Sequence, residues 1–403
     1  MVRGSFGGCG TFEGSEKWEQ AIKREETLYD RGNEMRSEFY RDYTRLLHSL
    51  GYSRLKHKTQ VFFNTRNDHV CTRLEHVNHV NSVSYTIANT LGLNTELTAA
   101  IAIGHDIGHA PFGHQGESEL KKITKRCFGE SFFHERNSLN FADNIELLQD
   151  DRGNFRNLFL TYAVRDGIIA HCGEVFDNGI FPRREAIDLR NGFTKAGQYM
   201  PYTWEGCVVK LSDKIAYLGR DIEDAFKLGF IGDKDAKRLR KLGEAYGFSI
   251  NTTGMINSLV SDICENSSPK EGMRFSEKGY GLLKEVRDYN YKVIYENKKF
   301  DYYRRYVRLI ITSLFGELSD WYKGKDTLLN IDGKKMGRLS ADFGSWLAKY
   351  CIADDAHNDA RCTNIKIYGD LADRQEYLHA VVDYIAGMTD QFAIEMFGLL
   401  TSF

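Results

Sequence analysis

The sequence predicts an all-α protein, and three observations support this prediction. The chain of 403 residues contains only 4 prolines, far below the roughly 5% of average usage, so the commonest helix breaker is nearly absent. Apolar residues recur at helical spacing in several long segments. Short stretches rich in glycine, asparagine and aspartate separate these segments, as is typical of turns between helices.

The first of these segments spans residues 77–91 and ends before Gly92, a residue type that commonly closes a helix. Asn94 then provides a capping side chain for a second segment. The apolar run of this second segment covers residues 97–103 and ends at Gly104. Two consecutive core helices are therefore expected here.

Further helical patterns follow at about residues 115–126, 134–148, 156–171 and 202–228. From about Asp233 onward the chain is again helical in character. Residues 265–272 form the clearest internal loop. Residues 1–14 form a glycine-rich arm, which we expect to become ordered only against a partner.

The composition is that of an ordinary soluble globular protein, with 42% hydrophobic and 27% charged residues. A net charge of -2 argues against wholesale coating of nucleic acid. No stretch approaches the roughly 18 apolar residues of a membrane span, so we expect a cytoplasmic protein without a membrane partner. The 8 cysteines contain no C-x-x-C pair, which excludes a zinc ribbon and favours reduced thiols.

The strongest chemical signal consists of His76, the adjacent pair His105 and Asp106, and Asp213, each at or near the end of an apolar helix. Two imidazoles and two carboxylates form a mixed set of ligands that suits a divalent metal ion: Mn, Mg, Fe, Co, Ni or Zn. The segment 103–117 contains three histidines and two carboxylates between glycines. A segment with so many polar and charged side chains is ill suited to a hydrophobic core, so it indicates a functional site.

With these motifs the sequence resembles the HD superfamily of phosphohydrolases. Within it, the sequence is similar to the dGTPase-like branch, which includes bacterial dGTPases and the mammalian SAM- and HD-domain dNTPase. The resemblance runs through most of the chain and is carried by residues 41–45, 54–62, 73–76, 103–117, 213–221 and 383–390.

This resemblance implies an HD-type helical core over residues 36–247, preceded by an arm over 1–35 and followed by a helical region over 248–403. It implies metal-dependent hydrolysis of a dNTP, with dGTP as one candidate, to a deoxynucleoside and inorganic triphosphate. The metal ligands of the family signature would be His76, His105, Asp106 and Asp213.

Three further residues match the family's catalytic positions. His114 and Glu117 correspond to its catalytic histidine and glutamate, and their i, i+3 spacing would place both on one helical face. A carboxylate behind an imidazole fixes its tautomer, which suits proton transfer to or from a phosphate ester. His134 resembles the family's active-site histidine after the HD helix.

The resemblance also implies a substrate site. Tyr217 would pack against the 2′ carbon of the sugar and exclude a ribose hydroxyl, while Asp221 and Gln60 would bind the 3′-hydroxyl. Arg73 and Lys214 are placed to bind the triphosphate. The chain departs from the family pattern at Glu75, Gly104, Glu135 and Asn137, which affects base selectivity and phosphate contacts rather than the metal ligands.

Two other functions fit the same residues. The order His76, His105-Asp106, His134, His171 and Asp213 also matches dinuclear HD phosphodiesterases and phosphatases, in which two metal ions activate a bridging hydroxide. A dNTP-sensing regulator with weak or no turnover is the second alternative. The resemblance further implies a homo-oligomer, tetrameric or hexameric, and an allosteric nucleotide, and single-stranded nucleic acid is a further candidate partner.

Overall fold

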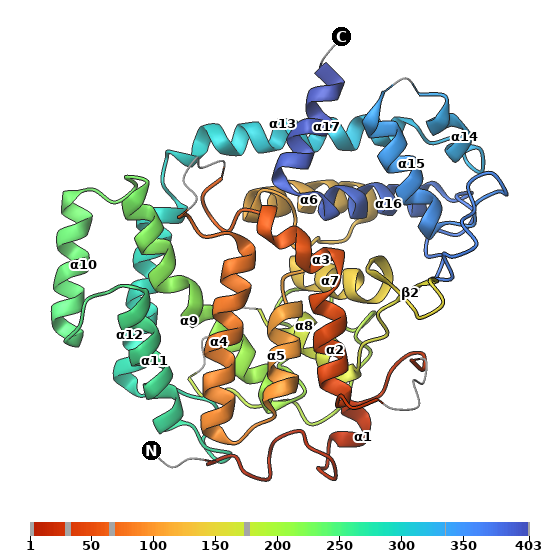
Figure 1. Ribbon diagram of the computed structural model, residues 1–403. Coiled ribbons are helices and arrows are strands. Elements are labelled where there is room, and N and C mark those ends of the chain that lie inside the picture. The colour runs from red at the N-terminus through yellow and green to blue at the C-terminus, as the bar shows by residue number, and fades with distance from the viewer. Residues whose placement is uncertain (1–3, 29–33, 64–68, 173–177, 335, 402–403) are drawn as a thin grey trace.

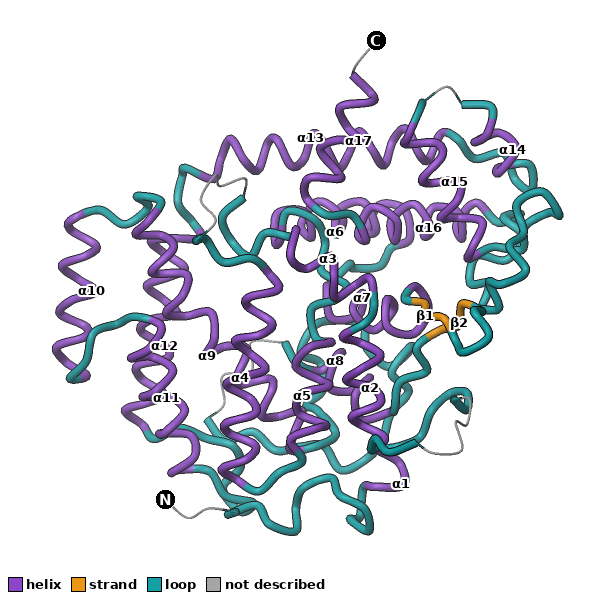
Figure 2. The backbone as a smooth tube through the Cα atoms, viewed as in Figure 1, coloured by secondary structure: helices purple, strands orange, loops and turns teal. Residues whose placement is uncertain are grey.

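The structure is a computed structural model that describes residues 4–28, 34–63, 69–172, 178–334 and 336–401 (Figure 1). Within these residues helices joined by loops make up the fold, and the only sheet is a small two-stranded one, as Figure 2 shows. The predicted all-α fold is therefore confirmed. No helix in the described ranges has the length and apolar character needed to cross a membrane.

The N-terminal part contains the short helix α1 (Trp18–Ala21), then α2 (Glu38–Leu47), α3 (Leu50–Arg54) and the 3-10 helix η1 (Leu55–His57). The next two helices are α4 (Arg73–Leu91) and α5 (Thr95–Gly104). They are the two predicted core helices. Gly92 ends α4 with a φ of 80°, and the side chain of Asn94 accepts hydrogen bonds from the first turn of α5.

A capping box begins α4 and explains one departure from the family pattern. Thr72 accepts a hydrogen bond from the backbone of Glu75, and the Glu75 side chain accepts one from the backbone N–H of Thr72 at 2.7 Å. Two N–H groups that lack partners within the helix are thereby satisfied. Glu75 therefore has a structural role at the start of this helix.

The middle of the chain differs from the prediction at two places. The segment predicted as one helix over 134–148 consists of α7 (His134–Asn140), the π-helix η2 (Phe141–Ile145) and the strand β1 (Leu147–Gln149). The segment predicted over 156–171 begins with the strand β2 (Phe155–Asn157) and continues with α8 (Tyr162–Ala170).

The cause of this difference is a turn between the two strands. Asp150 accepts backbone hydrogen bonds from Arg152 and Asn154, and Gly153 has a φ of 81°. This turn reverses the chain, so Leu147 pairs with Asn157 in an antiparallel ladder. The helix predictions for both flanking segments are therefore wrong at the ends that form the hairpin.

The remaining helices of the core are α6 (Gly113–Phe128) and α9 (Trp204–Lys227), of which α9 confirms the prediction over 202–228. The rest of the chain is helical, with the elements α10 (Asp233–Tyr246), α11 (Thr252–Asn266), α12 (Glu277–Asn290), η3 (Tyr291–Tyr295), α13 (Phe300–Asp320), α14 (Thr327–Asp332), α15 (Arg338–Tyr350), α16 (Arg374–Gly387) and α17 (Asp390–Thr401). The first two residues of the loop predicted over 265–272 still belong to α11, and the rest follow its end.

Two large apolar clusters hold these helices together. One contains buried side chains of α2, α5, α6 and α8 together with those of α13 to α17. The other surrounds α9, with side chains from α4, α10, α11 and α12. In Figure 1, α13 crosses above α6 and α16, and it packs against both. The C-terminal helices therefore rest directly on the elements that carry the His-Asp segment.

Residues 4–14, the described part of the glycine-rich arm, pack against their own chain, so the prediction that these residues need a partner is wrong. Phe6 is fully buried, and its ring meets that of Trp204 edge-on at 4.8 Å. Thr11 donates hydrogen bonds to the Glu205 carboxylate from its backbone and its hydroxyl, both at 2.9 Å. A buried aromatic side chain and paired polar groups thus fix the arm on α9.

Candidate active site

The four predicted metal ligands meet where α4, α5 and α9 come together. His76 projects from α4, His105 and Asp106 follow the end of α5, and Asp213 lies on α9. The His76 Nε2 atom lies 3.0 Å from Asp213 Oδ1. Ligand atoms of His76, His105 and Asp213 lie within 4.8 Å of one another. The Oδ2 atom of Asp106 lies 3.7 Å from His105 Nε2, so it joins the same cluster.

The end of α5 explains how two adjacent residues can reach one point. The helix stops at Gly104, and a turn leads from there to α6. Gly108 lies in this turn against α7, where an added Cβ atom would come within 2.3 Å of the backbone nitrogen of Ser138. Only glycine allows this close approach. The turn can therefore direct both His105 and Asp106 into the cluster.

The imidazole of His105 is prepared to bind a cation. Its Nδ1 atom lies 2.6 Å from the carbonyl oxygen of Ala102, an arrangement in which Nδ1–H donates the hydrogen bond. Its Nε2 atom then carries a lone pair, and it is buried without a hydrogen-bond partner among the described residues. A buried acceptor without a partner is costly unless a ligand satisfies it. This observation fits a divalent metal ion.

The two carboxylates of the cluster are held in their charged form. Burial favours the neutral acid of Asp213, but the hydrogen bond and the charge of His76 outweigh burial and lower its pKa below the usual range. Burial also favours the neutral acid of Asp106. The charge of Arg73 opposes burial, and the pKa of this carboxyl lies well below its usual range. Charged carboxylates are the form that binds metal ions.

Arg73 forms a buried ion pair with Asp106, and its Nη2 atom lies 3.4 Å from the backbone carbonyl oxygen of Gln60. The structure therefore places two of the predicted substrate residues, Arg73 and Gln60, beside the four candidate metal ligands. These four residues, His76, His105, Asp106 and Asp213, are called the metal cluster below. Lys214 lies on α9 next to Asp213. Of the two predicted cationic side chains, Arg73 thus contacts the cluster directly.

Glu117 connects the other two predicted catalytic residues, His114 and His134. Its carboxylate lies 3.4 Å from Nδ1 of His114 and 3.2 Å from Nδ1 of His134. It also accepts a hydrogen bond from the backbone N–H of His134 at 2.9 Å. Nε2 of His134 lies 4.0 Å from Oδ1 of Asp106, so this group of residues adjoins the metal cluster.

Burial and charge affect the histidines of the site in opposite ways. Burial lowers the pKa of His134, but the charges of Glu135 and Glu117 outweigh it and raise this pKa well above the usual value. The pKa of His109 falls well below its usual value because the ring is buried and near the charge of Arg73. His109 and His134 stack with ring centroids 4.7 Å apart. The site therefore pairs a charged with a neutral imidazole.

Two histidines of the site were missed or given another role in the sequence analysis. His109 belongs to the segment 103–117, and its Nε2 atom is buried without a partner among the described residues. Its place in that segment was the signal that could have identified it. His171 was assigned only to the dinuclear alternative, yet its ring lies 4.9 Å from that of His105.

Two of the residues predicted to bind the sugar lie on α9, and a residue that was not anticipated contacts one of them. Tyr217 and Asp221 follow Asp213 on this helix, and the hydroxyl of Tyr295 donates a hydrogen bond to Asp221 Oδ2. A cavity of about 70 Å³ is lined by side chains that include Gln60, His114 and Tyr295. The larger cavity, of about 370 Å³, lies among α6, α7 and α16 and contains none of the predicted site residues.

Comparisons with known proteins agree with this geometry. A family model for the HD domain matches residues 73–218, and one for a phosphohydrolase-associated domain matches residues 360–398. The chain is 32% identical to a deoxyguanosinetriphosphate triphosphohydrolase-like protein of Caldanaerobacter subterraneus subsp. tengcongensis, over 90% of this chain and 84% of the relative. Relatives with the same description from Desulfatibacillum aliphaticivorans and Clostridium tetani are 30% and 29% identical. These matches cover 89% and 94% of this chain, and 86% and 90% of the relatives.

Proposed function

Because this chain belongs to the HD-domain, deoxyguanosinetriphosphate triphosphohydrolase-like family of metal-dependent phosphohydrolases, we propose that it hydrolyses a deoxynucleoside triphosphate to a deoxynucleoside and inorganic triphosphate. The relatives' description makes dGTP the first substrate to test. One observation carries the proposal. The metal cluster and the group around Glu117 adjoin each other, since His134 Nε2 lies 4.0 Å from Asp106 Oδ1.

His76, His105, Asp106 and Asp213 would hold the divalent metal ion. When bound, this ion would supply a Lewis acid that polarises a phosphoryl oxygen. In the proposed reaction the oxygen of a water molecule forms a bond to the α-phosphorus while the bond from the α-phosphorus to the 5′-oxygen breaks. The 5′-oxygen takes up a proton, and the products are the deoxynucleoside and triphosphate.

The protein supplies the groups that exchange protons in this reaction. Glu117 contacts the Nδ1 atoms of both His114 and His134, so it directs their Nε2 atoms away from itself. The charged form of His134 suits either proton donation to the 5′-oxygen or contact with the negative triphosphate. Arg73 and Lys214 add positive charge for the same group.

Selection of a deoxyribose is proposed for the α9 side of the site. Tyr217 would exclude a 2′-hydroxyl by its bulk, and Asp221 and Gln60 would bind the 3′-hydroxyl. The hydrogen bond from Tyr295 to Asp221 supports this assignment, because it holds the buried carboxylate of Asp221 in one orientation. A steric wall combined with a polar contact discriminates between sugars more strongly than either feature alone.

The test is incubation of the purified chain with each dNTP and each NTP in the presence of Mn²⁺ or Mg²⁺, followed by chromatography of the products. Triphosphate and deoxynucleoside in equal amounts, with little turnover of the NTPs, are the expected products. Pyrophosphate and a nucleoside monophosphate would refute the proposal. The variant His105→Ala serves as the negative control, since it lacks one proposed metal ligand.

A second candidate function is that of a dinuclear phosphodiesterase or phosphatase, and one observation favours it. Ligand atoms of His105, Asp106 and His171 lie within 4.8 Å of one another, so the additional histidine of the dinuclear pattern is at the cluster. Such an enzyme requires two metal ions per chain for activity and acts on a mono- or diester. Activity that rises with the second equivalent of metal would favour this candidate.

We also propose that residues 36–247 form the catalytic core and that the arm 1–35 and the region 248–403 contribute to a homo-oligomer that binds effector nucleotides or single-stranded nucleic acid. Tyr302 and Leu309 on α13 are 81% and 53% exposed, which leaves apolar surface free for such contacts. Light scattering coupled to size exclusion, with and without dNTP, tests the assembly. A monomer of 46.2 kDa under both conditions would contradict it.

A further inference from the structure

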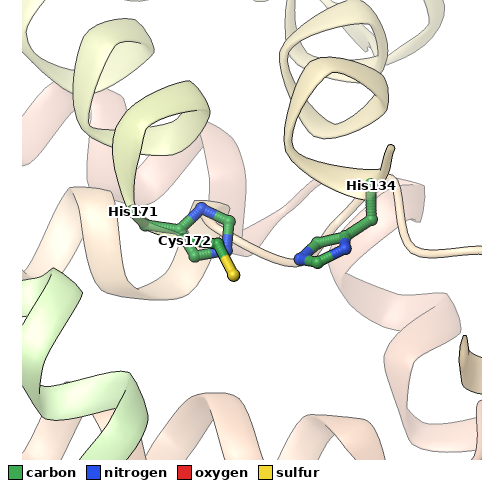
Figure 3. A group of neighbouring side chains, drawn as sticks. All are labelled: His134, His171 and Cys172. Atoms are coloured by element: carbon green, nitrogen blue, oxygen red, sulfur yellow. The ribbon is translucent and has the colours of Figure 1, made fainter. Parts of the chain in front are cut away.

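Three side chains with metal-binding atoms come together: His134, His171 and Cys172. They meet at the edge of the His134 ring that faces away from Glu117. His134 begins α7, while His171 and Cys172 directly follow α8. Figure 3 shows the sulfur of Cys172 and the ring of His171 facing the ring of His134. One ligand atom of each residue lies within 4.8 Å of the other two. This cluster was not anticipated from the sequence, because Cys172 has no neighbouring cysteine in the chain.

The orientation of this cluster is fixed by backbone contacts. Nδ1 of His171 lies 2.6 Å from the carbonyl oxygen of Ile168, an arrangement in which Nδ1–H donates and Nε2 keeps its lone pair. The ammonium group of Lys210 donates hydrogen bonds to the carbonyl oxygens of Ala170, at 3.2 Å, and of Cys172. Both the imidazole and the thiol are therefore held where they can act as ligands.

A buried carboxylate beside the cluster favours positive charge at this place. Glu135 is only 1% exposed, and neither of its oxygens has a hydrogen-bond partner among the described residues. Its Oε2 atom lies 3.6 Å from Nδ1 of His134. A buried carboxylate without hydrogen bonds is expensive unless positive charge balances it. The charged imidazole of His134 supplies this balance in the metal-free protein. A divalent cation bound at His134 would keep positive charge beside Glu135 once this imidazole has lost its proton.

We propose that His134, His171 and Cys172 form a second cation site that takes a thiophilic divalent ion such as Zn²⁺. One sulfur and two imidazole nitrogens favour Zn²⁺ or Co²⁺ over Mg²⁺ and Mn²⁺, which prefer oxygen ligands. Ligand atoms around Zn²⁺ lie at about 2.0–2.3 Å from the ion, so small side-chain rotations close the present spacing. On binding, the S–H bond of Cys172 and the Nε2–H bond of the charged His134 break, sulfur–metal and nitrogen–metal bonds form, and both protons pass to the buffer.

Occupancy of this site has a consequence for turnover, which rests on the proposed function. A cation that takes Nε2 of His134 removes the lone pair or proton that this imidazole would use in catalysis. Zn²⁺ at the second site therefore inhibits an enzyme that has its first metal ion. The dinuclear candidate makes the opposite prediction, since there the second ion is required for activity.

The experiment is a titration of the apo-protein with Co²⁺, followed by absorption spectroscopy and by elemental analysis after desalting. The proteins compared are the parent chain, Cys172→Ser, and Cys9→Ser as the control, because Cys9 is an exposed thiol in the arm. The parent and the control are expected to bind one more equivalent of Co²⁺ than Cys172→Ser. They are also expected to show the near-ultraviolet charge-transfer band of a thiolate bound to Co²⁺, which Cys172→Ser lacks.

Equal stoichiometry and no thiolate band in all three proteins would overturn the proposal. This readout does not depend on turnover, so it stands or fails separately from the proposed function. A second arm measures inhibition by Zn²⁺ of Mn²⁺-supported hydrolysis. Cys172→Ser is expected to require at least about ten times more Zn²⁺ for half inhibition, since loss of a ligand weakens metal binding by at least this factor. Identical inhibition curves would contradict the assignment of Cys172.

Discussion

Asp390, at the start of α17, accepts a hydrogen bond from the turn that leads into α6, the helix that carries His114 and Glu117. Its Oδ1 atom accepts a hydrogen bond from the backbone N–H of Phe112 at 2.7 Å, across 278 residues of sequence. Its Oδ2 atom accepts another from the N–H of Thr59 at 2.9 Å. Phe112 has a φ of 65°, a left-handed conformation that costs roughly 1–2 kcal/mol for a residue other than glycine. The C-terminal region therefore stabilises the strained turn just before His114.

This relationship predicts that Asp390→Ala lowers kcat at least about tenfold, because the turn before His114 is no longer held in its strained conformation. The buried N–H of Phe112 and the partly buried N–H of Thr59 also lose their acceptor. A buried group left without a partner costs about 1–3 kcal/mol, so the free energy of unfolding should fall as well. Steady-state kinetics and thermal denaturation measure the two effects.

The matched control is Asp373→Ala, which removes the side-chain cap of α16 and should cost about 1 kcal/mol of stability. It is expected to leave kcat unchanged. If Asp390→Ala loses stability but keeps the kcat of the control, the carboxylate supports folding without positioning the catalytic turn.

Glu117→Gln tests the residue that joins the two histidines proposed to be catalytic, His114 and His134. We predict a fall in kcat of roughly 10²–10⁴, the range for loss of general acid–base function, because a neutral amide no longer orients His114 and His134. Metal content should remain that of the parent chain, since Glu117 is not among the proposed ligands. The control is Glu119→Gln on the same helix, whose carboxylate pairs with Lys122 at 2.5 Å. Equal kcat values for the two variants would remove Glu117 from the mechanism.

Tyr217→Ala tests the proposed wall beside the sugar. The ratio of kcat/KM for a dNTP to that for the matching NTP should fall by about 10- to 100-fold, the order expected for loss of a purely steric exclusion. Tyr280→Ala is the control, because Tyr280 packs against the same apolar cluster from α12. An unchanged ratio would mean that the 2′ position is excluded by another group.

The buried side chain of Asp383 is expected to make the free energy of unfolding depend on pH. Burial raises the pKa of Asp383 to about 6, although hydrogen bonds from Tyr368 and Asn140 oppose this rise. The unfolded chain loses this proton at a pKa of about 3.9, so the folded state binds more protons between the two values. The stabilising contribution is therefore complete below about pH 4 and is lost as the pH rises through about 6.

Asp383→Asn removes this titration. Denaturant unfolding at pH 4 and pH 7 should show that the variant gains stability relative to the parent chain at the higher pH, by on the order of 2 kcal/mol. If Asp383→Asn and the parent chain differ in free energy of unfolding by the same amount at pH 4 and at pH 7, the raised pKa of Asp383 is contradicted.

Local sequence patterns predicted the elements that carry the metal cluster. Gly92 and Asn94 mark the junction of α4 and α5 in the sequence, and the structure has the helix end and the cap at these residues. The His-Asp pair follows the end of α5, as the apolar run over 97–103 predicts. Helix ends and apolar periodicity are local properties, so they can be recognised without tertiary information.

The features that were missed depend on tertiary contacts. Tyr295 reaches Asp221 across 74 residues of sequence, and the hydrogen bond of Asp390 to Phe112 spans 278. Neither residue lies in a motif that marks its partner. The β1–β2 hairpin was missed because its strands have three residues each, too few to show a clear alternation. Cys172 becomes a candidate ligand only where the ends of α7 and α8 meet.

Hydrolysis of a dNTP in ¹⁸O-labelled water, followed by mass spectrometry of the products, tests the central claim most directly. Attack of water at the α-phosphorus with cleavage of its bond to the 5′-oxygen predicts one ¹⁸O atom in inorganic triphosphate and none in the deoxynucleoside. Release of pyrophosphate with a deoxynucleoside monophosphate, or label in the deoxynucleoside, would contradict the account.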